Sequence, residues 1–340
     1  MTKRTRRTLL VVAAVLALLA LAVFLRSKAP PEAARLLPEA DGVLYVNLRP
    51  VRAFFKKNLN PPSRDPDYQA FVDATGIDWE KDLDEAAIAL HRMPDPNGPN
   101  GPVAYSMVLE GKLTGPKLRT WLETHAAVRE TYGGKTIYAI PSEGRTVRVC
   151  QIGYDMVAAS NFPTPEMIHS MIDRHRTAAL PFSGSSLLER YYREVPLLAL
   201  AWGVGEIGTP FNESGSISVL GWQLPLQSDS TYIASISPGL PLAGALRLRV
   251  EEIAPTEQAA AQQAAVLDTL ISLARGFAEP LNQNQAANRG LRDLLKSAQV
   301  TQKRDRVLLT AAVPTTVFSQ VASAQNSSGG TTSPAAPASQ

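Results

Sequence analysis

The chain contains one cysteine in 340 residues, and this scarcity limits what it can build. A disulfide bond within the chain would need two cysteines, and a metal site made of several cysteines is excluded for the same reason. Cys150 lies in the alternating run RTVRVCQIG. We therefore expect it to be a small buried side chain on a strand, with a reactive thiol as the alternative.

Basic residues become scarce once the first 28 residues are set aside. The formal net charge is +3, yet six basic residues stand in an N-terminal stretch that has no acid: Lys3, Arg4, Arg6, Arg7, Arg26 and Lys28. The remaining body has fewer basic than acidic residues, and no run of Lys and Arg alternates with aromatic residues. Because binding to nucleic acid needs a basic face, we expect no nucleic-acid partner.

Long hydrophobic runs are absent except for one, residues 8–25 (TLLVVAAVLALLALAVFL). Its 18 residues contain no charge, proline or glycine, and as a helix they would cover ~27 Å. A helix satisfies its own backbone hydrogen bonds in hydrocarbon, so we expect a retained single-pass anchor. The alternative is a signal peptide cleaved near Ser27–Ala29. Four basic residues precede the run and two follow it closely. This bias favours a cytoplasmic N-terminus and a body outside the cytoplasmic membrane, in the periplasm if the source is Gram-negative.

The pattern of the remaining chain divides it into further segments. After the basic tail and transmembrane anchor of residues 1–28, we expect a spacer at 29–38, a first α+β unit at 39–180 and a second, diverged α+β unit at 181–324. Residues 325–340 are small, polar and rich in proline and glycine, which predicts a disordered tail.

Hydrophobic periodicity predicts a mixed order of strands and helices in both units. In the first unit, strands are expected at 42–48, 86–92, 103–111 and three times within 136–160, and helices at 51–59, 68–76, 117–126 and 165–175. In the second, strands are expected at 196–204, 231–237, 245–254 and 303–313, and helices at 257–277, 291–299 and 315–324.

The repeated order predicts an ancient duplication. The expected fold is α+β, with two related units of antiparallel-rich sheet and helices packed on one side, preceded by one transmembrane helix.

Acidic residues alternate in GIDWEKDLDEAAIAL, from residue 78 to residue 84, with the rhythm of a calcium-binding loop. Such a loop needs glycine at its sixth position and glutamate at its twelfth, where this chain has Leu83 and Ala89. We expect a tight turn whose acids cap backbone amides and face water, while Ile77 and Trp79 pack inward. An irregular cation site is the alternative.

Other signatures of chemistry are missing. The four histidines, His91, His125, His169 and His175, lack the spacing of a helical metal pair. There is no Gly-x-Ser-x-Gly nucleophile motif. The glycines of GVGEIG (203–208) are not followed by a helical pattern that could hold a phosphate. We therefore predict no catalytic, cofactor-binding or metal-binding residue and no cofactor.

Aromatic residues gather in one region, which is a candidate interaction surface: Trp202, Phe211 and Trp222, with Tyr191 and Tyr192 upstream. Trp and Tyr suit contacts with lipid headgroups or a protein partner. Packing in a hairpin core is the interpretation that we favour, and the interaction surface is its alternative. The stretch 257–277 is low in charge, so its helix could cover a sheet with one face and offer the other to another protein.

Three stretches resemble one family. The opening LLPEADGVLYVNL, the later ATGIDWEKDLD and the strand pair ending GYDMVAAS are similar to pieces of an uncharacterised bacterial family of membrane-anchored extracytoplasmic proteins. In that family these pieces form a domain that is often duplicated. The resemblance covers residues 36–175 and, more loosely, the rest. It implies location and architecture, and it carries no catalytic residue.

These observations favour a non-catalytic binding or scaffold module of the cell envelope, with an envelope protein as partner. The alternatives are a carrier of apolar small molecules or lipids and a hydrolase with a dispersed site. A closed apolar pocket would favour the carrier, and convergent Ser, His and acidic side chains in a cleft would favour the hydrolase. A packed core with an exposed apolar patch would favour the partner-binding role.

Overall fold

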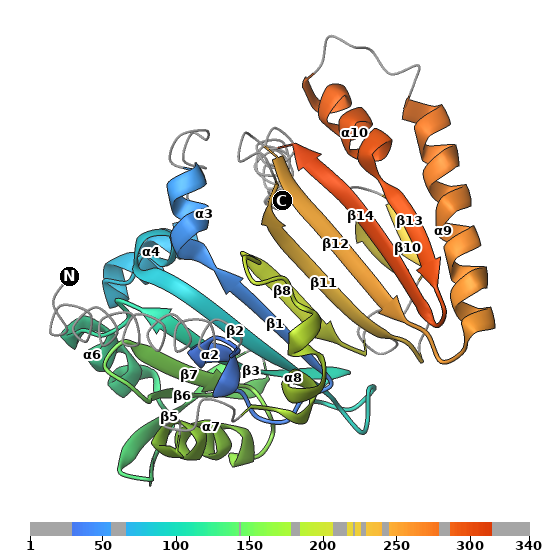
Figure 1. Ribbon diagram of the computed structural model, residues 1–340. Coiled ribbons are helices and arrows are strands. Elements are labelled where there is room, and N and C mark those ends of the chain that lie inside the picture. Colours follow the sequence, from blue (N-terminus) through green and yellow to red (C-terminus); the bar gives the residue numbers. More distant parts are fainter. Residues whose placement is uncertain are drawn as a thin grey trace, which may run out of the picture.

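The fold is α+β and is organised around one large antiparallel sheet (Figure 1). The computed structural model describes residues 29–55, 66–142, 144–177, 184–206, 216–219, 222–225, 229–239, 245–278 and 286–314. Twelve strands follow the order β13-β14-β12-β11-β8-β1-β2-β3-β7-β6-β5-β4, and a separate two-stranded sheet pairs β9 with β10. The two halves of the chain therefore share one sheet, in which β1 pairs with β8.

The strands of the first half are β1 (Gly42–Asn47), β2 (Leu83–Arg92), β3 (Val103–Gly111), β4 (Val128–Tyr132), β5 (Lys135–Ser142), β6 (Arg145–Gln151) and β7 (Met156–Ser160). Those of the second half are β8 (Ala201–Gly205), β9 (Ser216–Val219), β10 (Trp222–Pro225), β11 (Thr231–Pro238), β12 (Ala245–Ile253), β13 (Gln299–Lys303) and β14 (Arg306–Pro314).

The helices are α2 (Glu32–Arg35), α3 (Leu48–Phe55), α4 (Pro66–Thr75), α5 (Trp79–Asp82), α6 (Pro116–His125), α7 (Glu166–Thr177), α8 (Ser186–Tyr191), α9 (Glu257–Ala278) and α10 (Ala286–Ser297). A 3-10 turn, η1 (Tyr192–Glu194), follows α8.

The main core lies on one face of the sheet, which we name the first face. Its side chains alternate along the strands, as Val43 and Tyr45 do on β1. The helices α2, α7 and α8 cover this face, and Leu36, Met171 and Leu188 contribute their buried side chains to the core. Successive residues of a strand point to opposite faces of the sheet. The strand residues that alternate with the core residues therefore lie on the other face, which we name the second face.

Helices also cover the second face, so the prediction of helices on one side of the sheet is wrong. Val157 of β7 points away from the main core and packs with Phe71 of α4 and Leu118 of α6. In the other half, Val307 of β14 packs with Leu267 of α9. The reason lies in strands such as β7, MVAAS, which is buried at every position and needs cover on both faces.

The joint between the halves depends on close packing of β1 against β8. Two glycines, Gly203 and Gly205, lie on β8 opposite Leu44 and Gly42. A Cβ atom at position 205 would lie 2.6 Å from Gly42 Cα. On the first face the ring of Trp202 stacks on Tyr45 with centroids 5.3 Å apart, and the T-shaped contact of Tyr192 closes the cluster.

The acidic stretch forms a capped turn. Asp78 is the N-cap of α5, and its carboxylate accepts a hydrogen bond from Glu80 N at 3.2 Å. Ile77 is buried and Trp79 packs beside it, which confirms the predicted inward packing. Contrary to the expected exposure of the acids, Asp78 is itself buried, and it also contacts Lys81 and Tyr68.

Two predicted strand boundaries are wrong for local reasons. The strand expected at 196–204 begins at Ala201, because residues 196–199 turn and Ala199 N donates to Pro196 O. The strand expected at 303–313 begins only at Arg306 as β14, because β13 ends at Lys303 and a hairpin turn with Arg304 at φ 56 follows it.

None of the described helices is both long and apolar enough to cross a membrane. The predicted anchor at residues 8–25 and the helix predicted at 315–324 lie outside the described residues.

Candidate functional site

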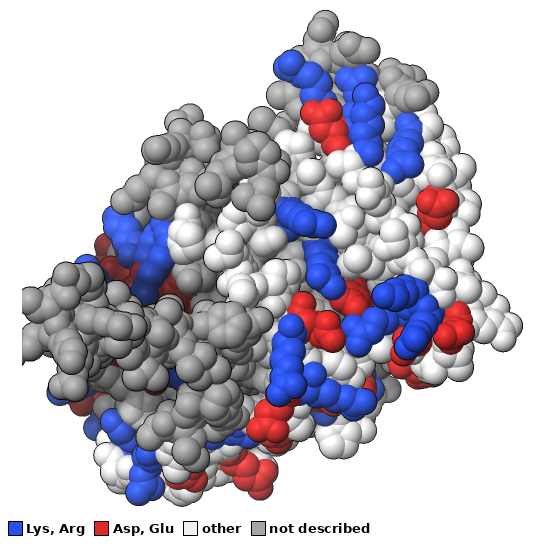
Figure 2. All heavy atoms as spheres, in the orientation of Figure 1, with Lys and Arg blue, Asp and Glu red and all other residues white. Residues whose placement is uncertain are grey.

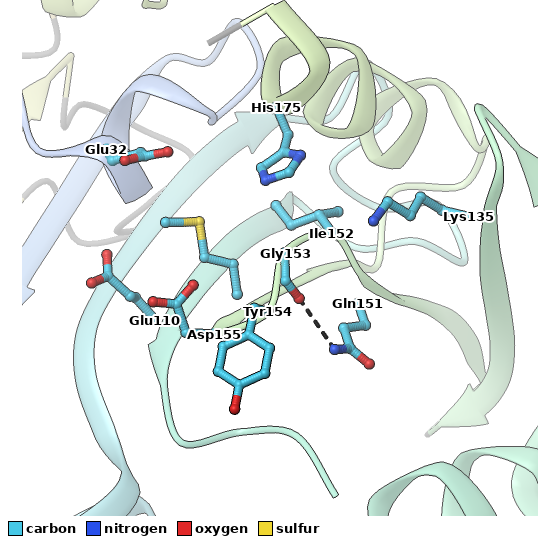
Figure 3. Close-up of a pocket in the computed structure, with 10 residues that line it drawn as sticks. Glu32, Glu110, Lys135, Gln151, Ile152, Gly153, Tyr154, Asp155 and His175 are labelled. Atoms are coloured by element: carbon cyan, nitrogen blue, oxygen red, sulfur yellow. Dashed lines mark hydrogen bonds between the residues drawn. The ribbon is translucent and has the colours of Figure 1, made fainter. Parts of the chain in front are cut away.

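A surface depression of about 590 Å³ lies beside the turn that joins β6 to β7 (Figure 3). Elements distant in sequence meet there: the first residue of α2, the end of β3, the start of β5 and the end of α7. Ten residues line it: Glu32, Glu110, Lys135, Gln151, Ile152, Gly153, Tyr154, Asp155, Met156 and His175.

The turn IGYD (152–155) gives the depression its floor. Ile152 N and Gly153 N both donate to Met156 O, and Gln151 Nε2 donates to Gly153 O at 3.1 Å. A side chain at position 153 would lie 3.3 Å from His175 Nε2, so glycine keeps the space under α7 open. Ile152 and Met156 are buried beneath, which makes the floor apolar.

Charges of opposite sign stand on different sides of the depression. Figure 3 shows Glu32, Glu110 and Asp155 on one side, and Lys135 on the other. Burial raises the pKa of Glu110, and the nearby carboxylates of Glu85, Asp155 and Glu32 raise it further, against the effect of Arg49. Burial lowers the pKa of His175, and Lys135 adds to this effect.

The lowered pKa of His175 favours its neutral imidazole at neutral pH. The lining therefore offers the carboxyl groups of Glu32, Glu110 and Asp155 and the ammonium group of Lys135, and Glu110 is already paired with Arg49 at 3.1 Å. Charged side chains of both signs are also interspersed over the face shown in Figure 2.

A second polar cluster is sealed in the core under the loop that precedes β1. His91 Nε2 lies 2.9 Å from Ser106 Oγ, which in turn lies 3.0 Å from Ser160 Oγ. Burial lowers the pKa of His91. This histidine and serine pair has the contact of a nucleophile and base, but Ser106 is 0% exposed and no substrate can reach it. The cluster therefore satisfies buried polar groups.

The other histidines are held by structural contacts. His169 stacks on Tyr132 with ring centroids 3.8 Å apart and contacts Glu130 Oε1 at 2.8 Å. His125 stacks on Trp121. Within the described part of the chain, no three His, Cys, Asp or Glu side chains are placed to hold a metal ion.

The predicted aromatic surface divides into core and undescribed parts. Trp202 is 4% exposed, so its ring belongs to the core rather than to a surface. Tyr191 and Tyr192 are half-buried against that core. The side chains of Phe211 and Trp222 lie outside the described residues. Sequence reasoning could not separate these roles, because the pairing of β8 with β1 places Trp202 on Tyr45.

Helix α9 carries two apolar stripes. The first, which includes Leu267, Ile271 and Ala274, is buried against the sheet and α10. The second is exposed to solvent, and α9 itself lies at the margin of the molecule, on the right in Figure 1. Its residues Val266, Leu273 and Phe277 are 43%, 53% and 69% exposed. We name these three residues together with Leu270 the α9 stripe; they recur at the spacing of one helix face.

Comparison with known proteins gives a likeness in solved structures only. No protein-family model matches the chain, and no curated protein matches it either. Crystal form III of TP0453 is similar with a TM-score of 0.45 and 11% identity, covering 88% of this chain and 99% of that one. Crystal form IV of TP0453 gives a TM-score of 0.46 and 12% identity, covering 86% and 96%. A likeness at this level says nothing about ligand, partner or activity.

Proposed function

We propose that this chain is a non-catalytic binding module of the cell envelope, anchored in the cytoplasmic membrane by residues 8–25 with its body outside the cytoplasm. The observation that carries the proposal is the α9 stripe, since exposed apolar residues in one line are typical of a protein interface. The body behind it is packed: the largest core side chains, such as Leu37 and Ile168, are fully buried.

The composition of α9 supports a partner with a neutral, apolar surface rather than a charged surface. In its 22 residues, the acidic and basic side chains are Glu257, Asp268 and Arg275. Arg275 is engaged inside the molecule, because its guanidinium donates to Leu295 O and Ala298 O at the end of α10. The outward stripe is thus flanked by Gln, Thr, Ser and Gly, and a neutral apolar helix face on a partner would complement it.

We also propose that the sheet arose from two related units, as the family resemblance of LLPEADGVLYVNL implies. The order β1-β2-β3-β7-β6 on one side of the joint has the same form as β8-β11-β12-β14-β13 on the other. In each series a helical segment follows the third strand, α6 in the first and α9 with α10 in the second. The units differ in the extra hairpin of β4 and β5 and in the segment between their first two strands.

Site-specific crosslinking in intact cells tests the binding role. A photoreactive amino acid at Leu273 should capture one reproducible envelope protein. The same group at Asp268 is the matched control, because it is exposed on the same helix but lies about 140° around the axis. No reproducible capture from position 273, or equal capture from both positions, would refute a partner on the α9 stripe. Fractionation of the full chain tests the anchor, which should keep the body in the membrane pellet.

A further inference from the structure

We infer that the partner of the α9 stripe is a second copy of this chain. The two copies join through antiparallel pairing of β13 with β13 of the second copy and through packing of the two α9 stripes. This inference rests on the proposed function, because it names the partner of the same surface. Its basis is one juxtaposition: the stripe lies beside the open edge of the large sheet.

The strand β13 ends the large sheet on one side. Among the described strands only β14 pairs with it, so its other edge is open. Lys303 pairs with Arg306 across a two-residue turn, and from there the direction of the backbone hydrogen bonds alternates along β13. Val300 and Gln302 therefore turn their backbone N–H and C=O groups to the open edge. An added strand would supply partners for these groups.

The α9 stripe lies on the flank of α9 that faces this edge. Helix α9 packs on β13 and β14, whereas α10 packs further inward, where Leu294 joins the cluster of Leu246 and Val313. Arg275 marks the α10 side of α9, because its guanidinium donates to two carbonyls at the end of α10. Leu273 lies about 160° around the helix axis from Arg275. The stripe therefore points away from α10 and toward the outer edge of β13.

A two-fold axis between two paired β13 strands brings the α9 helices to packing distance. Neighbouring strands of a sheet lie about 4.8 Å apart. Because α9 contacts both β13 and β14, its axis lies over the space between them, about 5 Å from the two-fold axis. Two helices related by that axis lie about 10 Å apart, which matches the 8–10 Å spacing of packed helices. Continuing the sheet thus also closes the two stripes against each other.

The sequence of β13 is self-complementary about that axis. Pairing centred on Thr301 sets Val300 opposite Gln302 of the second copy, and the reverse, so the outward backbone groups of both strands meet. Gln299 lies opposite Lys303 of the second copy, so no like charges oppose each other.

The α9 stripe is self-complementary as well. Val300 packs in the clusters of both Leu267 and Ile271, which places the middle of α9 within about one helical turn of the axis. The inner two residues of the stripe and its outer two residues are both centred between positions 271 and 272. An antiparallel copy therefore sets apolar side chains against apolar side chains along the whole stripe.

Disulfide formation in the full chain tests the strand pairing, because the natural thiol is buried. Thr301→Cys places a thiol on the two-fold axis, where the Cα atoms of a non-hydrogen-bonded pair lie about 4.5 Å apart, within disulfide range. Gln299→Cys, on the same face of β13, is the control, because its two copies lie about 14 Å apart. Mild oxidation in non-ionic detergent should link Thr301→Cys alone. No linked dimer from Thr301→Cys, or equal amounts from both variants, would overturn the inference.

Sedimentation of the full chain in the same detergent tests the stripe. The wild type should have the mass of a dimer. Leu273→Glu should weaken the dimer at least about tenfold, because its carboxylate would be buried without a partner against the second stripe. Ser272→Glu is the control: residue 272 is exposed but lies about 100° around the helix axis from Leu273, away from the stripe, and this variant should stay dimeric. Thermal unfolding checks that both variants are folded. A monomeric wild type, or equal dimerisation of the two variants, would overturn the inference.

Crosslinking from Leu273 in intact cells separates this inference from the proposed function. A product of twice the mass of the chain supports both. A product with a different protein would overturn the second copy as the partner and leave the binding role in place. No product would overturn the binding role itself, and the second copy with it.

Discussion

Replacement of Gly205 by alanine tests the joint between the two halves of the sheet. Gly205 lies on β8 directly across from Gly42 of β1. A Cβ atom at position 205 would lie 2.6 Å from Gly42 Cα and 2.7 Å from Asp41 O. Both are backbone atoms, so the overlap can be relieved only if the two strands move apart.

The cost follows from the size of that movement. Non-bonded carbon atoms pack at about 3.5–4.0 Å, so the strands must separate by roughly 1 Å. This would break the hydrogen bond from Glu206 N to Asp41 O, now 3.0 Å long. A lost backbone hydrogen bond costs about 0.5–1.5 kcal/mol and overpacking costs about 1–3 kcal/mol. We expect Gly205→Ala to lower the free energy of unfolding by about 3 kcal/mol.

Gly203→Ala is the matched control on the same strand and the same face. Its Cβ atom would approach Leu44 Cδ2 at 2.7 Å, but this is the end of a flexible, partly exposed side chain that can rotate away. Alanine also restricts the unfolded chain, which offsets about 0.4–1 kcal/mol. Urea unfolding of the full chain in detergent, followed by tryptophan fluorescence, measures both. Equal losses in the two variants would refute the backbone overlap as the cause.

Three further predictions concern buried groups. Trp202→Ala should lower the free energy of unfolding by about 3–5 kcal/mol, since it removes a buried ring stacked on Tyr45; a loss under about 1 kcal/mol in urea unfolding would contradict a core role. Burial raises the pKa of Glu252, so the wild type loses stability as the pH rises above the ordinary value of 4.5. Glu252→Gln, which keeps an acceptor for Ser230 Oγ, should therefore be more stable than the wild type at pH 8 and not below pH 4.5; thermal unfolding at both pH values decides this. Burial lowers the pKa of His91, so the neutral imidazole contributes its full stability above pH 6.5, and this contribution is lost as the pH falls below that value. His91→Gln should therefore flatten the dependence of the urea midpoint on pH below 6.5; an unchanged dependence would show that His91 does not cause the loss.

The sequence was sufficient for elements whose pattern is local. The periodicity of 257–277 predicts α9 almost to its ends, and the strands at 42–48, 86–92 and 103–111 are found as β1, β2 and β3. Each of these segments carries its own hydrophobic period and its own stop signal. The hairpin strand β4 was missed because VRETY is mostly exposed and polar, and only its pairing with β5 makes it a strand.

The candidate site could not be predicted, because it depends on long-range pairing. Glu32, Glu110 and Asp155 meet only after β3 pairs with β7 and α2 docks on the sheet. The spacing of these three residues in the sequence does not indicate that they lie close together in the fold. The same holds for Trp202, whose apolar neighbours on β1 lie more than 150 residues away. The sequence does indicate the turn itself, because Gly153, Tyr154 and Asp155 separate the two strand patterns on either side.

The single thiol has a practical consequence. Cys150 is fully buried under α7, and burial raises its pKa to about 11, so a thiol reagent can modify it only when β6 opens to solvent. The rate at which a thiol reagent labels Cys150 therefore measures how often β6, in the first half of the sheet, opens to solvent. Conversely, a cysteine placed anywhere on the surface would react alone, which makes the natural chain a ready background for attaching a single probe.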